Sequence, residues 1–210
     1  MKKILHIVEI SWIFVYGIFS QRKEHRFALK IMDSVEKELG VVMAEESKLK
    51  AARGYSVSKS IYLDAFVLLY GRRLNKEERK RLVYYFTAAA LYDAFFDEAK
   101  LTDDEIQKMS FDTEQYIPKT DAEKAWIYLH LYLKNCVLNK EGYLHCCYDV
   151  YNIQKASLQQ FNSTLTNVEL EKLTHDKGGY SVFICNYYVQ QNFTKVELQC
   201  WYLIGSCIQL

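Results

Sequence analysis

The sequence is poor in the residues that build tight turns. It contains one proline and eight glycines in 210 residues, whereas average usage gives about ten prolines and about fifteen glycines in this length. Folds made of many short strands need such residues, because each turn favours glycine, proline or asparagine. The shortage argues against sandwiches, barrels and glycine-loop nucleotide folds, and it predicts an all-α fold.

The sequence also lacks an excess of charge of either sign. Lysine and arginine number 27 and the acidic residues 26, which leaves a net charge of +1. Nucleic-acid binding requires clustered positive charge, and the densest basic stretch, residues 76–81, is interleaved with Glu77 and Glu78. We therefore expect no nucleic-acid partner.

No Cys-x-x-Cys pair occurs among the six cysteines. They lie within apolar runs, as Cys185 and Cys207 do, and free cysteine is among the most buried residue types. This pattern predicts core thiols in a reducing compartment, and therefore a cytoplasmic protein.

An apolar run near the N-terminus is too short and too interrupted to span a bilayer. Residues 4–19 contain His6, Glu9 and Ser11, and a membrane-spanning helix needs about 20 apolar residues. A signal peptide is the alternative, but no small-x-small cleavage site follows the run. We therefore predict a buried first helix and no stable membrane insertion.

Helix-start signals recur along the chain. In a capping box, the side chain of a Ser or Thr cap and that of a Glu three residues later satisfy each other's backbone N–H groups. Matching pairs are Thr102/Glu105, Thr120/Glu123, Thr166/Glu169 and Thr194/Glu197, with Asn75/Glu78 as a variant. The predicted helices, eight to ten in all, include residues 4–19, 24–38, 41–53, 58–70, 76–98, 166–192 and 196–210. Residues 109–119, which contain Pro118, are the predicted loop, and residues 1–210 are predicted to form a single domain.

Two acidic residues lie at the end of a long apolar helical stretch. Asp93 and Asp97 are four residues apart, so their carboxylates share one face of the predicted helix. Buried carboxylates near the negative end of a helix dipole are costly unless a positive group offsets them. Lysines are one candidate, and Mg²⁺ is the better one because it binds one or two carboxylates together with phosphate oxygens. The alternative is a pair of solvated acids at a helix end.

Two further stretches carry candidate polar residues. Gly178 and Gly179 lie inside a helical pattern and cost about 2 kcal/mol there relative to alanines. They indicate a kink or a helix face that something approaches closely, or else a helix end with glycine after the cap. Lys177 beside them is a flexible cation suited to a phosphate. Gln154 lies on another predicted interior helix, where a glutamine commonly satisfies a backbone or side-chain partner.

In their order along the chain, these stretches resemble the class I isoprenoid synthases, which include trans-prenyl diphosphate, squalene and phytoene synthases and terpene cyclases. The resemblance covers about residues 75–210. DAFFDE (residues 93–98) resembles the first aspartate-rich motif, and IQKASL (residues 153–158) resembles the Gly-Gln-x-x-Asp-Leu segment. KGGYS (residues 177–181) resembles the Lys-Thr-Ala/Gly segment. IGSCIQL (residues 204–210) resembles the run that precedes the second metal-binding motif.

The resemblance implies a helical bundle around a central apolar cavity. It implies that Asp93 and Asp97 are ligands of Mg²⁺ and that Lys177 and Gln154 contact the diphosphate of an allylic prenyl diphosphate. Aromatic walls would then shield the carbocation that is left when the diphosphate departs. No residue is assigned a catalytic role of its own, and a homodimer is left open.

The sequence departs from this family in three ways. Ser157 stands where the family has an aspartate. The Gly-Lys-x-x-Arg segment and the Arg-Arg-Gly after the first aspartates are missing, which favours cyclisation or head-to-head condensation over chain elongation. The sequence stops at Leu210, where the second acidic motif should begin, so either the chain is shortened and lacks C-terminal helices or it cannot complete the metal cluster.

These departures keep two alternatives to an enzyme open. One is a non-catalytic helical scaffold or interaction protein that retains the fold, and the other is an unrelated helical bundle with a ligand-binding or regulatory role. The enzyme hypothesis requires that Asp93 and Asp97 face the same apolar cavity as Lys177. If Asp93 points into open solvent, that hypothesis fails.

Overall fold

The chain folds into helices wherever its structure is described. The computed structural model describes the backbone of residues 2–98, 101–161, 165–189 and 192–209, and the side chains of this part except those of residues 2–18, 160, 161 and 209. No strand occurs in these residues, so the all-α prediction is confirmed for them. Within the same ranges, none of the helices combines the length and the apolar character that crossing a membrane requires.

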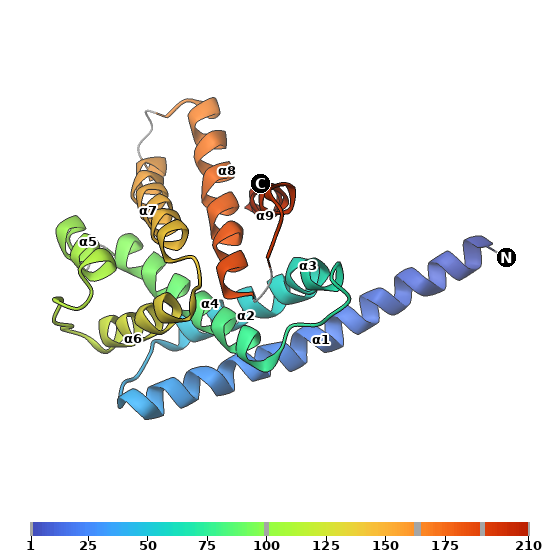
Figure 1. Cartoon of the computed structure of the whole chain (residues 1–210), viewed down its shortest axis with the longest axis horizontal. Helices are drawn as coiled ribbons and strands as arrows, with labels where there is room; N and C mark the ends of the chain where they lie inside the picture. The colour runs from blue at the N-terminus through green and yellow to red at the C-terminus, as the bar shows by residue number, and fades with distance from the viewer. Residues whose placement is uncertain (1, 99–100, 162–164, 190–191, 210) are drawn as a thin grey trace.

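Most of the helices are several turns long (Figure 1). The α-helices are α1 (Lys2–Leu39), α2 (Glu45–Ser58), α3 (Asp64–Leu68), α4 (Lys76–Asp97), α5 (Asp103–Phe111), α6 (Asp121–Cys136), α7 (Lys140–Ser157), α8 (Asn167–Phe183) and α9 (Lys195–Gln209). Three short turns of other helix types join or extend them: the π-helical η1 (Lys59–Leu63) between α2 and α3, and the 3₁₀ turns η2 (Leu158–Phe161) after α7 and η3 (Ile184–Tyr188) after α8.

Several helix boundaries differ from the sequence prediction. The helix predicted at 41–53 begins only at Glu45 and continues to Ser58, and residues 109–111 of the predicted loop belong to α5. The segments predicted at 4–19 and 24–38 form the single helix α1, because residues 20–23 contain neither glycine nor proline to interrupt it. The N-terminal part of α1 extends beyond the other helices (Figure 1), and the burial predicted for its first residues falls outside the described side chains. The helix predicted at 166–192 ends earlier, because α8 passes into the tighter η3 at Ile184.

The predicted helix caps are present. The side chains of Asn75, Thr102 and Thr166 form complete capping boxes at α4, α5 and α8. At α6, the Thr120 hydroxyl accepts from the backbone N–H of Glu123, while the Glu123 carboxylate accepts from the backbone N–H of Lys119, one residue before the cap. Such caps satisfy backbone groups that a helix start otherwise leaves unpaired.

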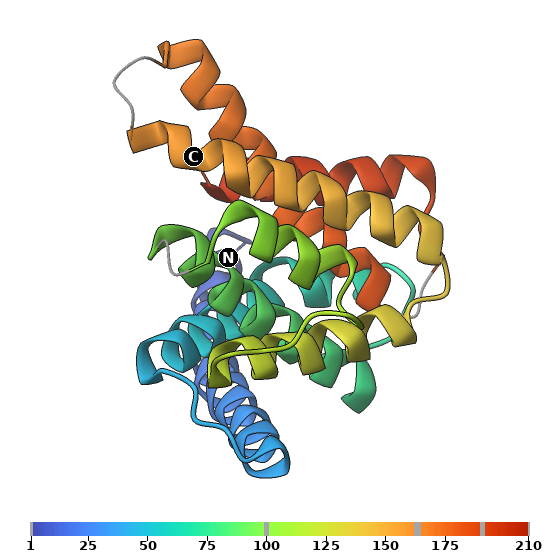
Figure 2. The ribbon, with the colours of Figure 1, turned by 90° about the vertical axis from the view of Figure 1, so that its left-hand side faces the viewer.

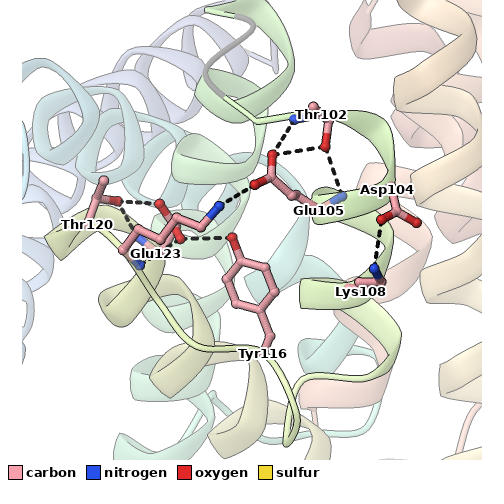
Figure 3. Close-up of polar contacts among 8 residues, drawn as sticks. Thr102, Asp104, Glu105, Lys108, Tyr116, Thr120 and Glu123 are labelled. Carbon is pink, nitrogen blue, oxygen red and sulfur yellow. Dashed lines mark hydrogen bonds and ion pairs between the residues drawn. The ribbon is translucent and has the colours of Figure 1, made fainter.

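The caps of α5 and α6 lie side by side and are joined by an ion pair between Lys119 and Glu105 (Figure 3). The Tyr116 hydroxyl donates to the buried Glu123 carboxylate over 2.9 Å. These contacts hold the loop that was predicted at 109–119 and that runs here from α5 to α6. They thereby hold the start of α5 to the start of α6.

Helix α4 is at the centre of the packing. It contacts α1, α2, α6, α7 and η3, and its buried side chains include Leu82, Val83 and Leu91. A helix that is apolar around most of its circumference is expected in such a position.

The cysteines are only partly core residues. All six are free thiols; Cys146 and Cys185 are buried, as predicted. Cys200 and Cys207 on α9 are exposed, so the prediction of core thiols is wrong for these two. Both lie in an apolar stretch of sequence, but they fall on the face of α9 that is turned away from α8.

The paired glycines of α8 allow α9 to approach its backbone. Helix α8 continues through Gly178 and Gly179 to Phe183, so the glycines neither end nor interrupt it. A Cβ added at Gly205 of α9 would overlap the carbonyl oxygen of Gly178, and one added at Gly179 would overlap the ring of Tyr202. The close approach that the sequence indicated is therefore that of a neighbouring helix, as the adjacent ribbons of α8 and α9 in Figures 1 and 2 illustrate.

Candidate functional site

A small cavity lies among α4, α5, α6, α7, α8 and η3. Its volume is about 90 Å³, and six of its 17 lining residues are Phe, Tyr or Trp. The aromatic side chains are Tyr85, Tyr92, Phe111, Trp126, Tyr143 and Tyr188. Asp93 and Gln154 also line this cavity.

Asp93 is a half-buried carboxylate with two partners. The side-chain amide of Gln154 donates to Asp93 Oδ1 over 2.7 Å, and Lys50 Nζ lies 2.9 Å from Asp93 Oδ2. The Asp93 side chain is 31% exposed and that of Lys50 57% exposed. Asp93 therefore faces the cavity with one oxygen held by a buried amide and the other by a lysine at the surface.

A chain of hydrogen bonds connects this carboxylate to α8. Gln154 is buried near the end of α7, and its backbone carbonyl accepts from the Ser157 hydroxyl over 2.7 Å. Lys177 of α8 in turn donates to that hydroxyl over 3.4 Å. Asp93 and Gln154 thus meet from two helices, although 61 residues separate them, and Lys177 of a third helix reaches Ser157 on the last turn of α7.

Not every residue predicted for the site lines the cavity. Asp97, one turn after Asp93 on α4, is exposed. Among the described residues, neither Asp97 nor Lys177 belongs to the cavity lining, and no residue of α9 does. The structure therefore joins Asp93 to Gln154 and leaves Asp97 at the outer surface. The requirement that both aspartates and Lys177 face one apolar cavity is met by Asp93 and not by Asp97 or Lys177.

Asp93 and Asp97 are the two carboxylates that α4 offers to a cation near its C-terminal end. Within the described residues, no group of three or more His, Cys, Asp and Glu side chains could hold a metal. Asp93 already binds a cation, the ammonium group of Lys50, and Asp97 offers a second carboxylate on the same helix. Mg²⁺ commonly uses one or two carboxylates and completes its shell with water and phosphate oxygens, so a cation here would have to displace Lys50 from Asp93 and take most of its ligands from water and a bound diphosphate.

The hydroxyl groups of the cavity tie its walls together. The Tyr85 hydroxyl donates to the Ser181 carbonyl over 2.6 Å, and the Tyr92 hydroxyl lies 2.8 Å from the Ser110 hydroxyl. Burial raises the pKa of both tyrosines above the usual value. These side chains therefore stay neutral and present uncharged aromatic rings to the cavity.

Sequence reasoning missed Lys50 and His130. Lys50 is one of two lysines on α2, and nothing local in the sequence distinguishes it. His130 lines the cavity and stacks on Trp126, with ring centroids 4.6 Å apart and 12° between the planes. Burial lowers the pKa of His130 to about 4. A single histidine within the apolar stretch WIYLHLYL is the signal that could have identified it.

Comparison of the chain with protein families, with characterised proteins and with solved structures gave no match. The resemblance to isoprenoid synthases therefore rests on the residues that carry the motifs.

Proposed function

We propose that this chain binds an allylic prenyl diphosphate together with Mg²⁺ and ionises it, in the manner of the class I isoprenoid synthases. The observation that carries the proposal is the contact between Asp93 and Gln154 at the edge of an aromatic cavity, with Lys177 linked to Gln154 through Ser157. Three segments that resemble separate motifs of one family thus meet at one place. Cyclisation or head-to-head condensation is the reaction class that the missing elongation motifs favour.

In this proposal, the role of each site residue follows from the chemistry of its side chain. Asp93, with Asp97 beside it on α4, would hold the cation, and the Gln154 amide keeps the Asp93 carboxylate oriented. Lys177 would donate to the diphosphate oxygens as a flexible point charge. When bound, Mg²⁺ neutralises the charge that develops on the leaving diphosphate.

The aromatic walls would receive the hydrocarbon part of the substrate. The rings of Tyr85, Tyr92 and Trp126 exclude water, and their faces attract a developing positive charge. The cavity of about 90 Å³ is smaller than an engineered cavity of about 150 Å³ that accepts benzene. A prenyl chain therefore enters only if lining side chains rotate, and short chains should need the least rotation.

Pyrophosphate release tests this proposal. The protein is incubated with Mg²⁺ and with dimethylallyl, geranyl, farnesyl or geranylgeranyl diphosphate, and the released pyrophosphate is measured. We expect release with at least one substrate and a loss of about a hundredfold in Asp93→Ala, because charge stabilisation of the leaving group is removed.

Asp104→Ala is the matched control. Asp104 is an exposed carboxylate that also binds a lysine, Lys108, over 2.8 Å, but it lies outside the cavity (Figure 3). Its release rate should equal that of the unchanged protein. Absence of release with all four substrates would contradict ionisation by this chain.

A second candidate is a non-catalytic helical protein that keeps the fold. The ion pair between Asp93 and Lys50 favours it, because the carboxylate already has a positive partner without any metal. The two candidates differ in one respect that can be measured. A scaffold binds no prenyl diphosphate, with or without Mg²⁺.

A further inference from the structure

Helix α1 carries its positive charge in one exposed patch. Between residues 19 and 30 the exposed charged side chains are all basic: Arg22, Lys23, Arg26 and Lys30. We call these four residues the basic patch. Glu24 is the only acid in the stretch, and it is buried in ion pairs with α4 and η1. Further along the helix, residues 33–38 contain three acids and one lysine, so the positive charge is confined to one segment of α1.

The basic patch has no acid to neutralise it. None of its four side chains forms a hydrogen bond or an ion pair with another residue that the structure describes. Arg22, Arg26 and Lys30 follow one another at intervals of four residues, and like charges at this spacing destabilise a helix. An anionic partner that covers the patch removes this repulsion.

Aromatic side chains accompany these cations at the surface. The patch lines a surface hollow together with Phe19, Phe27 and Arg79, and the lining contains no acidic side chain. Phe19 is 65% exposed, although burial of a phenylalanine is strongly favourable. The hollow therefore offers both positive charge and an apolar ring to a partner.

An apolar stretch of the same helix precedes the basic patch. Residues 4–19 contain a single charged residue, and the N-terminal part of α1 extends beyond the other helices (Figure 1). Because 18 residues make five turns, positions 4, 8 and 12 of the helix are in register with Arg22, Arg26 and Lys30. These positions hold isoleucine, valine and tryptophan. Position 6, a histidine, is in register with the buried Glu24. One side of α1 is thus apolar in its first half and basic in the next turns.

A membrane surface with anionic lipids fits both parts of this side. Interfacial helices place apolar residues at the boundary of headgroups and acyl chains, while lysine and arginine attract the anionic headgroups. The apolar stretch is about 24 Å long as a helix, shorter than the hydrocarbon core of about 30 Å, which favours lying in the surface over crossing it. Nucleic acid or an acidic protein would cover the cations but leave Phe19 and the apolar stretch in water.

We propose that α1 docks this protein on membranes that contain anionic lipids. Residues 4–19 lie in the interface, and the basic patch lies against the lipid phosphates. The attachment is peripheral and reversible. It does not involve the cavity next to α4, so it stands whether or not the chain acts on a prenyl diphosphate.

Co-sedimentation of the full chain with lipid vesicles tests the proposal. One set of vesicles contains phosphatidylcholine alone, and the other contains equal parts of phosphatidylcholine and phosphatidylserine. We expect binding to the mixed vesicles that is at least about tenfold tighter than binding to phosphatidylcholine alone. Because the attraction is screened by salt, the difference should shrink as the ionic strength rises.

Two double variants with the same loss of charge separate the patch from the net charge of the protein. Arg22→Gln with Arg26→Gln should weaken binding to the mixed vesicles by about 25-fold, or about fivefold for each cation. Lys140→Gln with Lys195→Gln removes two exposed cations from α7 and α9 and should change binding less than about twofold. All four side chains are exposed and lack an ion pair with any described residue, so both variants should fold.

The fluorescence of Trp12 reports on the apolar stretch directly. Trp126 and Trp201, the other two tryptophans, are 5% and 0% exposed, so their emission is set by the core. Mixed vesicles should therefore shift the emission to shorter wavelength through Trp12 alone. In Trp12→Phe the shift should disappear while co-sedimentation is retained.

Three results would overturn the proposal. These are no co-sedimentation with the mixed vesicles, equal losses in the two double variants, or unchanged Trp12 emission on vesicles that bind the protein. A DNA duplex is the competing probe. If it binds the protein more tightly than the mixed vesicles do at the same salt concentration, and loses affinity in the Arg22 and Arg26 variant, the patch is a nucleic-acid site instead.

Discussion

Two carboxylates, Glu24 on α1 and Asp93 on α4, each bind a basic side chain, but in different surroundings. The Glu24 side chain is 7% exposed and binds Arg79 over 2.8 Å, with Lys59 Nζ at 3.7 Å. It also accepts from the Tyr55 hydroxyl over 2.9 Å. Asp93 is 31% exposed, and its basic partner Lys50 lies mostly in solvent.

This difference distinguishes a carboxylate that stabilises the fold from one that is available to a ligand. The partners of Glu24 are themselves mostly buried, so exchanging any of them would leave another charge without compensation. The partner of Asp93 is a surface lysine whose ion pair is worth little, and the carboxylate borders a cavity. A ligand can therefore replace Lys50 at small cost, which is what a binding site requires.

The largest effect is expected when the buried ion-pair network around Glu24 is broken. Glu24→Ala should lower the free energy of unfolding by about 3 kcal/mol, because it leaves Arg79 and Lys59 without their shared buried partner. Asp93→Ala should lower it by less than about 1 kcal/mol. Urea denaturation of both variants measures the contrast, and equal losses would show that Asp93 is structural as well.

The next effect comes from His130, which is buried as a neutral group. Its pKa is lowered to about 4 in the folded protein, against about 6.5 in the unfolded chain. The unfolded chain therefore binds more protons between these values, and stability falls as the pH drops from about 6.5 to about 4, by about 2–3 kcal/mol for this group.

Comparing the unchanged protein with His130→Phe separates the contribution of His130 to the pH dependence of stability from the contribution of the carboxylates. Free energies of unfolding are measured at pH 7 and near pH 4.5. The unchanged protein should lose more stability between these pH values than the variant does. Parallel losses would mean that His130 is protonated in the folded state.

A smaller effect is expected where α9 meets α8. Gly205→Ala should cost about 1–3 kcal/mol, because the added methyl group overlaps the backbone of Gly178 and the helices must separate. Gly54→Ala is the control, since its methyl group would lie 3.1 Å from a ring atom of Phe86, a side chain that can shift. Thermal unfolding of both variants tests whether α9 holds α8, and with it Lys177, in place.

The smallest expected effect tests whether the Asp93 carboxylate is available to a ligand. Lys50→Met removes the ammonium group that competes with a metal ion for Asp93 Oδ2. We expect Mg²⁺ to bind about threefold more tightly in the presence of farnesyl diphosphate, as loss of a weak surface ion pair allows. Calorimetric titration measures the change, and weaker binding would mean that Lys50 itself contacts the ligand.

The local features of the fold could be predicted from the sequence, while most of the contacts between helices could not. The pair Thr102 and Glu105 predicts a helix start because both groups lie within one turn of the chain. The paired glycines of α8 predict a close approach but do not name its partner, which is Gly205 on another helix.

In the candidate site, too, some residues could be predicted from local sequence and others could not. Asp93 was identified by its spacing to Asp97 in an apolar helical stretch and Gln154 by its position on a predicted interior helix, and the structure brings the two together. Lys50 carries no local signal, because its role depends only on the crossing of α2 over α4. His130 was overlooked because a histidine in an apolar helix is commonly a satisfied core residue, and only the structure shows that Nε2 lacks a partner.

The central claim is that Asp93 is a carboxylate held ready for a metal-bound diphosphate at the edge of the cavity. Calorimetric titration of farnesyl diphosphate with Mg²⁺ into the unchanged protein, Asp93→Asn and Asp104→Asn tests it most directly. The account predicts binding that is weakened at least about tenfold in Asp93→Asn, a loss of about 1.4 kcal/mol, and unaffected in Asp104→Asn. Equal affinities in all three proteins, or no binding by the unchanged protein, would contradict it.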